Sequence, residues 1–228
     1  MDISGEAREY IKKTKNNLIE KIAGRDEYKA QGIPVSFFMA GSPGAGKTEF
    51  SRSIIEVLGM PMVRIDADEI REDIPGYDGG NAELFQSACI KGVEILYDHV
   101  NKKKLNAIVD GTFASYEVAH KNIKRALDKN RKVAIFYIYQ KPEDAWRFTV
   151  SREKEDRRHI TKDIFINAFF KARENVNKIK EDFGKDVSIF FIEKNFNHGI
   201  EKFEINVDDI DKFIKIKYTP QMLEKLLK

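Results

Sequence analysis

The sequence has one cysteine, no long apolar run and almost no excess of charge of either sign. Cys89 is the only thiol among 228 residues, so an intrachain disulfide is excluded, and its place on an apolar helical stripe predicts a packed side chain. The longest apolar runs, such as residues 35–41, are far shorter than the ~20 residues that span a bilayer. The 40 basic and 37 acidic residues leave a formal charge of +3, so neither a membrane nor a nucleic acid is expected as a partner.

The amino terminus lacks the features of an export signal. Residues 1–21 carry charges throughout and have no apolar core, so we expect a cytoplasmic protein. The length suits one buried α/β core better than two domains of ordinary size. We therefore predict an N-terminal helical extension over residues 1–30 and a single domain over residues 31–228.

Apolar runs of strand type alternate with segments of helical period along the chain. The expected strands cover residues 34–41, 61–66, 105–112, 132–140 and 187–195, and the tail after Ile200 adds a further strand and helix. The expected helices lie near residues 47–58, 81–103, 115–130, 142–155 and 161–183. This alternation predicts a mainly parallel sheet of five or six strands with helices on both faces. Ligands of such sheets bind at the carboxyl ends of the strands.

A glycine-rich segment directly after the first expected strand matches the phosphate-binding pattern G-x-x-x-x-G-K-[ST]. It reads Gly41-Ser42-Pro43-Gly44-Ala45-Gly46-Lys47-Thr48, and a helical segment follows it, as the pattern requires. Glycines let successive backbone N–H groups converge on phosphate oxygens at a helix N-terminus. We therefore predict a P-loop NTPase fold that binds ATP through residues 41–49, including Glu49. Lys47 is expected to act on the β- and γ-phosphates and Thr48 to bind Mg²⁺.

Acidic residues follow the second and third expected strands. Asp66 and Glu69 have the spacing of a capping box, which gives Asp66 a structural role. Asp68 lies in the first helical turn, and we predict that it is the general base that takes the proton of the attacking hydroxyl. Asp110 ends the third strand and is expected to hold Mg²⁺ or to bind a substrate hydroxyl, with a turn-forming Asp-Gly pair as the structural alternative.

An arginine segment follows the fourth expected strand. Pro142 opens a helix on which Arg152 continues the inward stripe of Ala145 and Phe148, and a basic stretch containing Arg158 comes next. Phosphoryl transfer spreads negative charge over equatorial oxygens, and arginines that close over the site neutralise it. We expect a lid that carries Arg152 and Arg158, with surface ion pairing as the alternative for each.

The order and spacing of these motifs resemble the zeta toxin family of P-loop kinases over about residues 34–195. The segments that carry the resemblance are GSPGAGKTEF, RIDADEIREDIPGY, IVDGTFAS and the arginine helix that leads to RRHITKD. The resemblance implies that residues 31–228 form a zeta-toxin-like kinase domain that phosphorylates UDP-N-acetylglucosamine at the sugar 3′-hydroxyl. It also implies a separate antitoxin chain as a partner.

The resemblance further implies roles for individual residues. The family's base, Walker pair and two charge-stabilising arginines match Asp68, Lys47, Thr48, Arg152 and Arg158. Its substrate contacts match Asp110, Thr112 and a helix glutamate sixteen residues before Asp110, which is Glu94. Two positions differ from well-known members, which have an arginine two residues after the threonine, where Ala114 stands here, and a glutamate in place of Asp110.

Two other functions stay open at this point. A polynucleotide 5′-hydroxyl kinase would share the P-loop, the catalytic aspartate and the arginine lid, but it would need a basic channel. A nucleotide-binding regulator or ATPase module would hydrolyse ATP without passing phosphate to an acceptor. The three possibilities differ in whether labelled phosphate reaches a nucleotide sugar, an oligonucleotide or only water.

Overall fold

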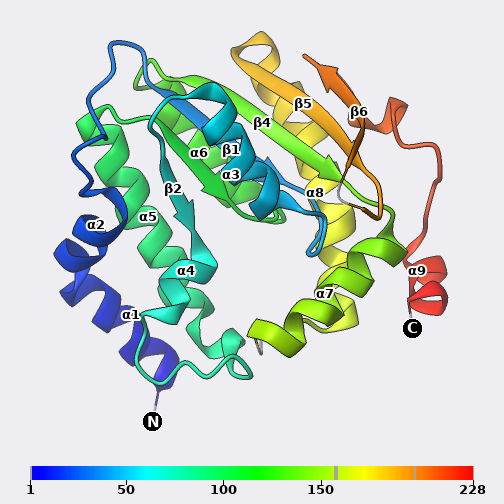
Figure 1. The fold of residues 1–228 in the computed structure, drawn as a ribbon, viewed down its shortest axis with the longest axis horizontal. Coiled ribbons are helices and arrows are strands. Elements are labelled where there is room, and N and C mark those ends of the chain that lie inside the picture. The colour runs from blue at the N-terminus through cyan, green and yellow to red at the C-terminus, as the bar shows by residue number, and fades with distance from the viewer. Residues whose placement is uncertain (1, 157–158, 198, 228) are drawn as a thin grey trace.

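The structure is a computed structural model that describes residues 2–156, 159–197 and 199–227. Within these residues, six strands form one sheet in the order β2-β3-β1-β4-β5-β6 (Figure 1). Strands β1 to β5 are parallel, and β6 pairs antiparallel with β5. The strands are β1 (Val35–Ala40), β2 (Val63–Asp66), β3 (Ala107–Asp110), β4 (Lys132–Tyr139), β5 (Val187–Lys194) and β6 (Ile200–Ile205). This arrangement confirms the predicted fold class, and the added tail strand is the antiparallel one.

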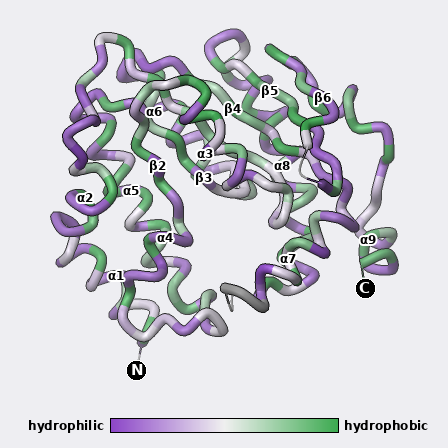
Figure 2. The backbone as a smooth tube through the Cα atoms, in the orientation of Figure 1, coloured by the Kyte–Doolittle hydropathy of each residue, from purple (hydrophilic) through white to green (hydrophobic). Residues whose placement is uncertain are grey.

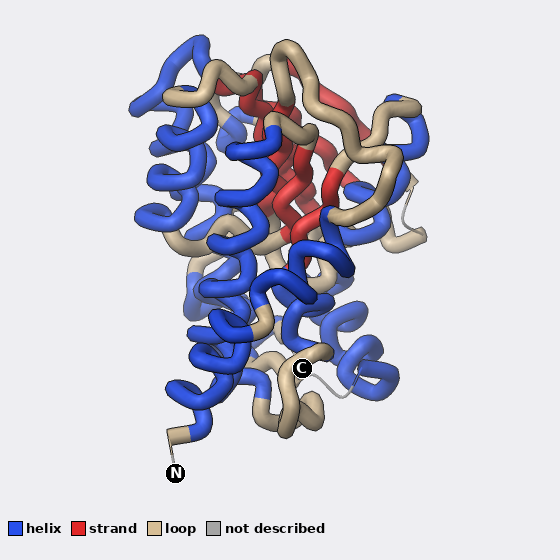
Figure 3. Tube along the Cα trace, turned by 90° about the vertical axis from the view of Figure 1, so that its left-hand side faces the viewer, coloured by secondary structure: helices blue, strands red, loops and turns tan. Residues whose placement is uncertain are grey.

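Helices cover both faces of the sheet, as the side view in Figure 3 shows. Residues of α5, α6 and α8 pack with one set of strand side chains, while α3 packs on the opposite face. The α-helices are α1 (Ile3–Lys13), α2 (Lys15–Ala23), α3 (Lys47–Leu58), α4 (Ala67–Glu72), α5 (Gln86–Lys103), α6 (Tyr116–Leu127), α7 (Pro142–Asp156), α8 (Lys162–Phe183) and α9 (Pro220–Leu226). Short 3₁₀ helices cover Ala82–Phe85, Gly184–Asp186 and Ile210–Lys212.

The apolar patterns of the sequence account for these layers. In β4 every residue after Lys132 is buried, which is expected of a central parallel strand with helices on both faces. Figure 2 shows the hydrophobic colour along this strand. In α8, buried residues recur from Phe165 to Ile179 at helical spacing, and the Thr161 side chain caps the helix by accepting the Ile164 N–H. Cys89 is fully buried in α5, as predicted.

The opening segment packs onto the domain instead of standing apart from it. Helix α1 ends at Lys13 and is followed by Thr14, whose hydroxyl donates to the Tyr10 carbonyl at 2.8 Å; α2 begins at the next residue. Ala7, Ile11 and Leu18 join the main core, and both helices contact α5. The division of the chain at residue 30 stays a prediction. In the part of the chain that the structure describes, no helix combines the length and apolar character needed to cross a membrane.

Candidate active site

The carboxyl ends of β1, β2 and β3 meet at one edge of the sheet and border a cleft of about 750 Å³. Parallel strands place their carboxyl ends together, so residues distant in sequence become neighbours here. The cleft brings together most of the predicted site residues, namely Pro43, Gly44, Lys47, Thr48, Asp68, Asp110, Thr112 and Arg152. The α7 helix, which carries Arg152, forms one wall. The remaining predicted loop residues, Gly41, Ser42, Ala45, Gly46 and Glu49, complete the P-loop and the first turn of α3.

The P-loop has the backbone geometry of an anion cradle. Gly44 and Gly46 have φ angles of 68° and 83°, a region that side chains disfavour, and α3 begins directly afterwards at Lys47. A Cβ atom on Gly44 would collide with the Ala145 carbonyl of α7, so glycine lets that helix approach the loop. The loop is also joined to β3, because the Gly41 N–H donates to the Thr112 carbonyl at 3.2 Å.

Lys47 lies at the mouth of this loop. Its Nζ donates to the Ser42 carbonyl at 2.6 Å, so the side chain reaches from the first residue of α3 back to the start of the P-loop. Thr48 follows in the first turn of α3, and its carbonyl accepts from the Ser51 hydroxyl at 2.9 Å. The ammonium and the positive end of the α3 dipole point to one anionic ligand at this position.

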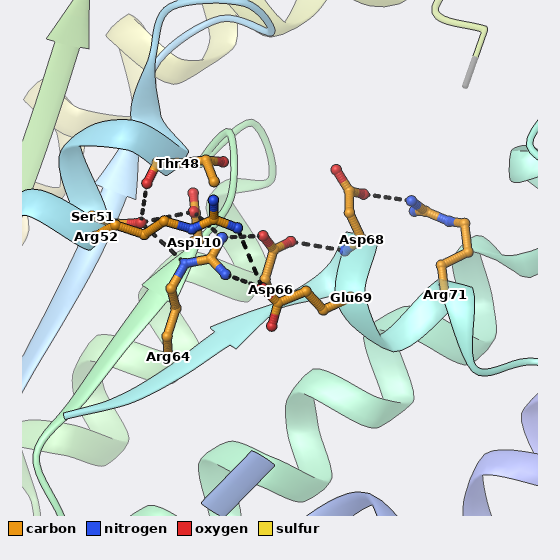
Figure 4. Close-up of polar contacts among 9 residues, drawn as sticks. All are labelled: Thr48, Ser51, Arg52, Arg64, Asp66, Asp68, Glu69, Arg71 and Asp110. Atoms are coloured by element: carbon orange, nitrogen blue, oxygen red, sulfur yellow. Dashed lines mark hydrogen bonds and ion pairs between the residues drawn. The ribbon is translucent and has the colours of Figure 1, made fainter. Parts of the chain in front are cut away.

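Arg64 links the acidic residues at the ends of β2 and β3 (Figure 4). Its side chain is only 11% exposed and forms ion pairs with Asp66, Glu69 and, at 2.8 Å, Asp110 Oδ2. Its Nε donates at 3.1 Å to Ser51, whose hydroxyl lies 3.0 Å from the same Asp110 oxygen. One guanidinium therefore joins β2, β3, α4 and the P-loop helix.

The predicted capping box is only half correct. The Asp66 side chain caps α4 by accepting the Asp68 N–H at 2.8 Å, but the Glu69 carboxylate binds Arg64 instead of returning to the backbone of Asp66. A guanidinium is a stronger partner for a carboxylate than a backbone amide is, which explains the difference. Besides capping α4, Asp66 also contributes to the lining of the cleft.

Asp66 and Asp110 face each other as register partners of β2 and β3. Burial, the charge of Asp110 and the charge of Asp68 together raise the pKa of Asp66 to about 6, although Arg64 opposes this change. Burial also disfavours the charged form of Arg64, but the neighbouring carboxylates of Asp66 and Asp110 raise its pKa above the ordinary value. The acids at this edge are thus held together by a permanently charged arginine.

Asp68, the predicted base, is oriented by an arginine that the sequence analysis missed. Asp68 is 40% exposed, and its Oδ1 accepts from Arg71 Nη1 at 2.5 Å. Arg71 is only 2% exposed and also donates to Gln86 Oε1 at 3.0 Å, while its guanidinium lies 6.0 Å from the Tyr77 ring centroid. The spacing of three residues between Asp68 and Arg71 on one helix was the signal available in the sequence.

Two predicted residues are not brought into the cleft by the described structure. Glu94 is bound by Lys91 at 2.8 Å and by Lys121 at 3.1 Å and is not among the cleft-lining residues. Hydrogen bonds from these two lysines lower the pKa of Glu94 to about 2. Arg158 lies outside the described residues. Its role as part of a lid stays a prediction.

The oxygen atoms of Thr48 and Asp110 suit a magnesium ion. Both residues line the same cleft, and hydroxyl and carboxylate oxygens are the hard ligands that Mg²⁺ prefers. Among the described residues, no group of three or more histidine, cysteine, aspartate or glutamate side chains could hold a metal on its own. Mg²⁺ at a nucleotide site usually has one or two protein ligands, with water and phosphate oxygens completing the shell. The donor set therefore fits Mg²⁺ bound together with a nucleotide.

Similarity to known proteins extends over most of the chain. The family model described as zeta toxin matches residues 19–207. Toxin PezT of Streptococcus pneumoniae serotype 4 is 26% identical over 134 residues, which cover 56% of this chain and 53% of that protein. The HslU ATPase subunit of an ATP-dependent protease from Petrotoga mobilis is 33% identical over 78 residues, which cover 34% of this chain and 16% of that protein. This chain thus spans about half or less of the length of these curated relatives.

A solved structure shares the whole fold. It comes from a characterisation of the PezAT chromosomal toxin-antitoxin system of Streptococcus pneumoniae and superposes with a TM-score of 0.69 at 20% sequence identity. The superposition covers 95% of this chain and 86% of that one. At this identity the likeness concerns the fold, including the helices that precede the sheet.

Proposed function

The chain belongs to the zeta toxin family, and we propose that it transfers the γ-phosphoryl group of ATP to a hydroxyl group of a small molecule. The observation that carries this proposal is the position of Asp68. Its half-exposed carboxylate lines the same cleft as Lys47 and Thr48 of the phosphate cradle. A carboxylate at such a place can accept the proton of a hydroxyl that attacks a bound triphosphate.

The donor side of the cleft is built to hold phosphate. Backbone N–H groups of the P-loop and the α3 N-terminus surround the β- and γ-phosphates. Lys47 exchanges its bond to the Ser42 carbonyl for the phosphate oxygens, which places its charge where negative charge accumulates during transfer. Arg152, on the α7 wall, adds a second positive charge from the opposite side.

The acceptor side depends on Asp68 and Arg71. The acceptor hydroxyl donates its proton to the Asp68 carboxylate as its oxygen forms a bond to the γ-phosphorus and the bond from that phosphorus to the β,γ-bridging oxygen breaks. Arg71 donates to the Asp68 carboxylate and so holds its orientation. Thr48 and Asp110 would hold Mg²⁺, which, when bound, neutralises part of the phosphate charge.

For the acceptor we propose a nucleotide sugar such as UDP-N-acetylglucosamine, with Asp110 and Thr112 contacting the sugar. Membership of the zeta toxin family and a cleft of about 750 Å³ support this choice. Glu94 would join the acceptor site only by leaving its two lysine partners. The similar fold found in the PezAT toxin-antitoxin system supports the proposal that an antitoxin chain is also a partner of this protein.

The test is a parallel acceptor assay with labelled ATP and Mg²⁺. UDP-N-acetylglucosamine, related UDP-sugars and a 5′-hydroxyl oligonucleotide are offered separately, and the labelled product is separated and identified. We expect label on a UDP-sugar, and Asp68→Asn should lower the rate of that transfer by about a hundredfold or more while ATP binding persists. Label on the oligonucleotide would favour a polynucleotide kinase, and hydrolysis without transfer to any acceptor would favour a regulator. Transfer by Asp68→Asn at the wild-type rate would refute the role of this residue.

A further inference from the structure

A buried lysine lies behind the phosphate cradle. Lys194 is the last residue of β5, is only 5% exposed, and donates from its Nζ to the Gly46 carbonyl at 3.4 Å. Among the described residues, no carboxylate forms an ion pair with it. Burial lowers the pKa of Lys194, and the charge of Glu49 opposes this change. The protein thus keeps a lysine in its interior beside the P-loop; among the described residues no carboxylate contacts it directly, and only the more distant charge of Glu49 favours its charged form.

The contact between Lys194 and the loop is close. A Cβ atom on Gly46 would collide with the Lys194 Nζ, so the ammonium packs directly against this glycine. The two residues are 148 positions apart in the sequence, and only the order β1-β4-β5 of the sheet brings them together. Lys194 does not line the cleft itself, so it acts on a ligand through the loop.

The peptide unit between Gly46 and Lys47 transmits this effect. In a trans peptide the C=O and N–H groups point in opposite directions, so a carbonyl that faces Lys194 turns the Lys47 N–H away from it. The Gly46 carbonyl also accepts the Phe50 N–H at 3.2 Å, so it points along α3. The Lys47 N–H of the same peptide therefore points out of the N-terminal end of α3. A positive charge at the carbonyl end polarises the peptide and strengthens its N–H as a donor to an anion.

The charge itself requires a partner. An uncompensated buried ammonium is costly, and a polyphosphate held by the loop supplies the missing negative charge. We propose that Lys194 is a positioning residue for the phosphate chain of the donor nucleotide, orienting and polarising the Gly46–Lys47 peptide from behind. This inference rests on the proposed function and adds to it a residue outside the family motifs. Because the effect of Lys194 on nucleotide binding is electrostatic, it should depend on the charge of the ligand.

Two variants separate charge from hydrogen bonding. Lys194→Met removes both, whereas Lys194→Gln removes the charge and keeps an N–H donor on a side chain that is one bond shorter. Lys132→Met is the matched control, because Lys132 is exposed at the opposite, amino end of the neighbouring strand β4. Binding of ATP, ADP, AMP and adenosine is measured by calorimetry for each protein, together with the thermal midpoint of the unliganded chain.

We expect both Lys194 variants to bind ATP about tenfold to a hundredfold more weakly, as one unit charge acting on a multiply charged anion at an effective dielectric constant of about 20 predicts. The loss should shrink from ATP to ADP to AMP and vanish for adenosine, with no loss in Lys132→Met. The unliganded thermal midpoint of Lys194→Met should stay equal or rise, since a buried unpaired charge has been removed.

Three results would overturn the inference. ATP affinity equal to wild type in both variants would exclude any role in phosphate binding. An equal loss for all four ligands would place Lys194 at the nucleoside. If both unliganded variants have a lower thermal midpoint, and their ATP affinity falls in proportion to it, Lys194 stabilises the fold and has no specific role in phosphate binding. A wild-type chain that binds no nucleotide would instead overturn the proposed function, and this inference with it.

Discussion

Replacement of Asp66 by asparagine is expected to remove part of the pH dependence of the stability of the unliganded protein. Asparagine is nearly isosteric and can still accept the Asp68 N–H that the aspartate caps. Arg64 keeps two carboxylate partners, Glu69 and Asp110, in the variant. The change removes one buried charge, and because asparagine has a single acceptor oxygen it also loses one of the two hydrogen bonds that Asp66 accepts, from the Asp68 N–H and from Arg64; this second loss does not depend on pH.

The sign and size of the effect follow from the pKa of Asp66. Folding raises this pKa from the ordinary value of 3.8 to about 6, so the folded state binds the proton more tightly than the unfolded chain does. The stability linked to Asp66 is complete below pH 3.8 and is lost as the pH rises through 6. A difference of about two pKa units corresponds to roughly 3 kcal/mol, since each unit is worth about 1.4 kcal/mol.

The assay is urea denaturation of wild type and Asp66→Asn at several pH values between 4 and 8, without nucleotide or metal. The difference in unfolding free energy, variant minus wild type, should increase by roughly 2.5 kcal/mol over this range, with most of the rise between pH 4 and 6. Asp186→Asn, at an exposed aspartate in the turn before β5, is the control for the change of net charge. A difference that stays flat with pH would refute the argument that burial and Asp110 hold Asp66 in an unfavourable charged state.

Two further substitutions test the catalytic side of the cleft. Arg71→Met should lower kcat by at least about tenfold with an unchanged ATP affinity, because the Asp68 carboxylate loses the bond that orients it. In the double variant with Asp68→Asn, the two losses in kcat should not multiply. Multiplicative losses would show that Arg71 acts independently of Asp68. Arg152→Ala should lower kcat by about a hundredfold or more with a modest effect on ATP affinity, because its charge is needed mainly in the transition state. An unchanged kcat would show that Arg152 does not contribute to catalysis.

The elements that local pattern determines were predictable from the sequence. The buried run of β4 and the apolar stripe of α8 each contain their own signal, and the P-loop is a contiguous motif. The acids at positions 66, 68 and 110 were placed near the loop because strand ends meet at one edge. Partners that form across strands were not predictable. The pattern of β2 does not reveal that Arg64 turns toward Asp110, 46 residues away.

Side-chain partners also explain why individual residues have contacts that the sequence does not indicate. Glu69 stands at the capping-box position, but Arg64 competes for its carboxylate and prevails. Glu94 has the sequence spacing of a substrate contact, but lysines on its own helix and on α6 bind it. Spacing along the chain gives a position on an element, whereas these outcomes depend on which charges lie across from it.

Arg64 and Lys194, both largely buried near the cleft, have opposite electrostatic consequences. Arg64 is matched by carboxylates on β2, β3 and α4, so it cancels negative charge that would otherwise repel a triphosphate from the acceptor side. Lys194 forms no ion pair within the described residues, so its charge is left for the ligand on the donor side. A polyphosphate bound on the P-loop would have on one side the acids that Arg64 neutralises. On its other side, behind the loop, would be Lys194, which forms no ion pair among the described residues. In the complex that we propose, this distribution of charge would favour binding with the terminal phosphate toward Asp68 and the acceptor hydroxyl.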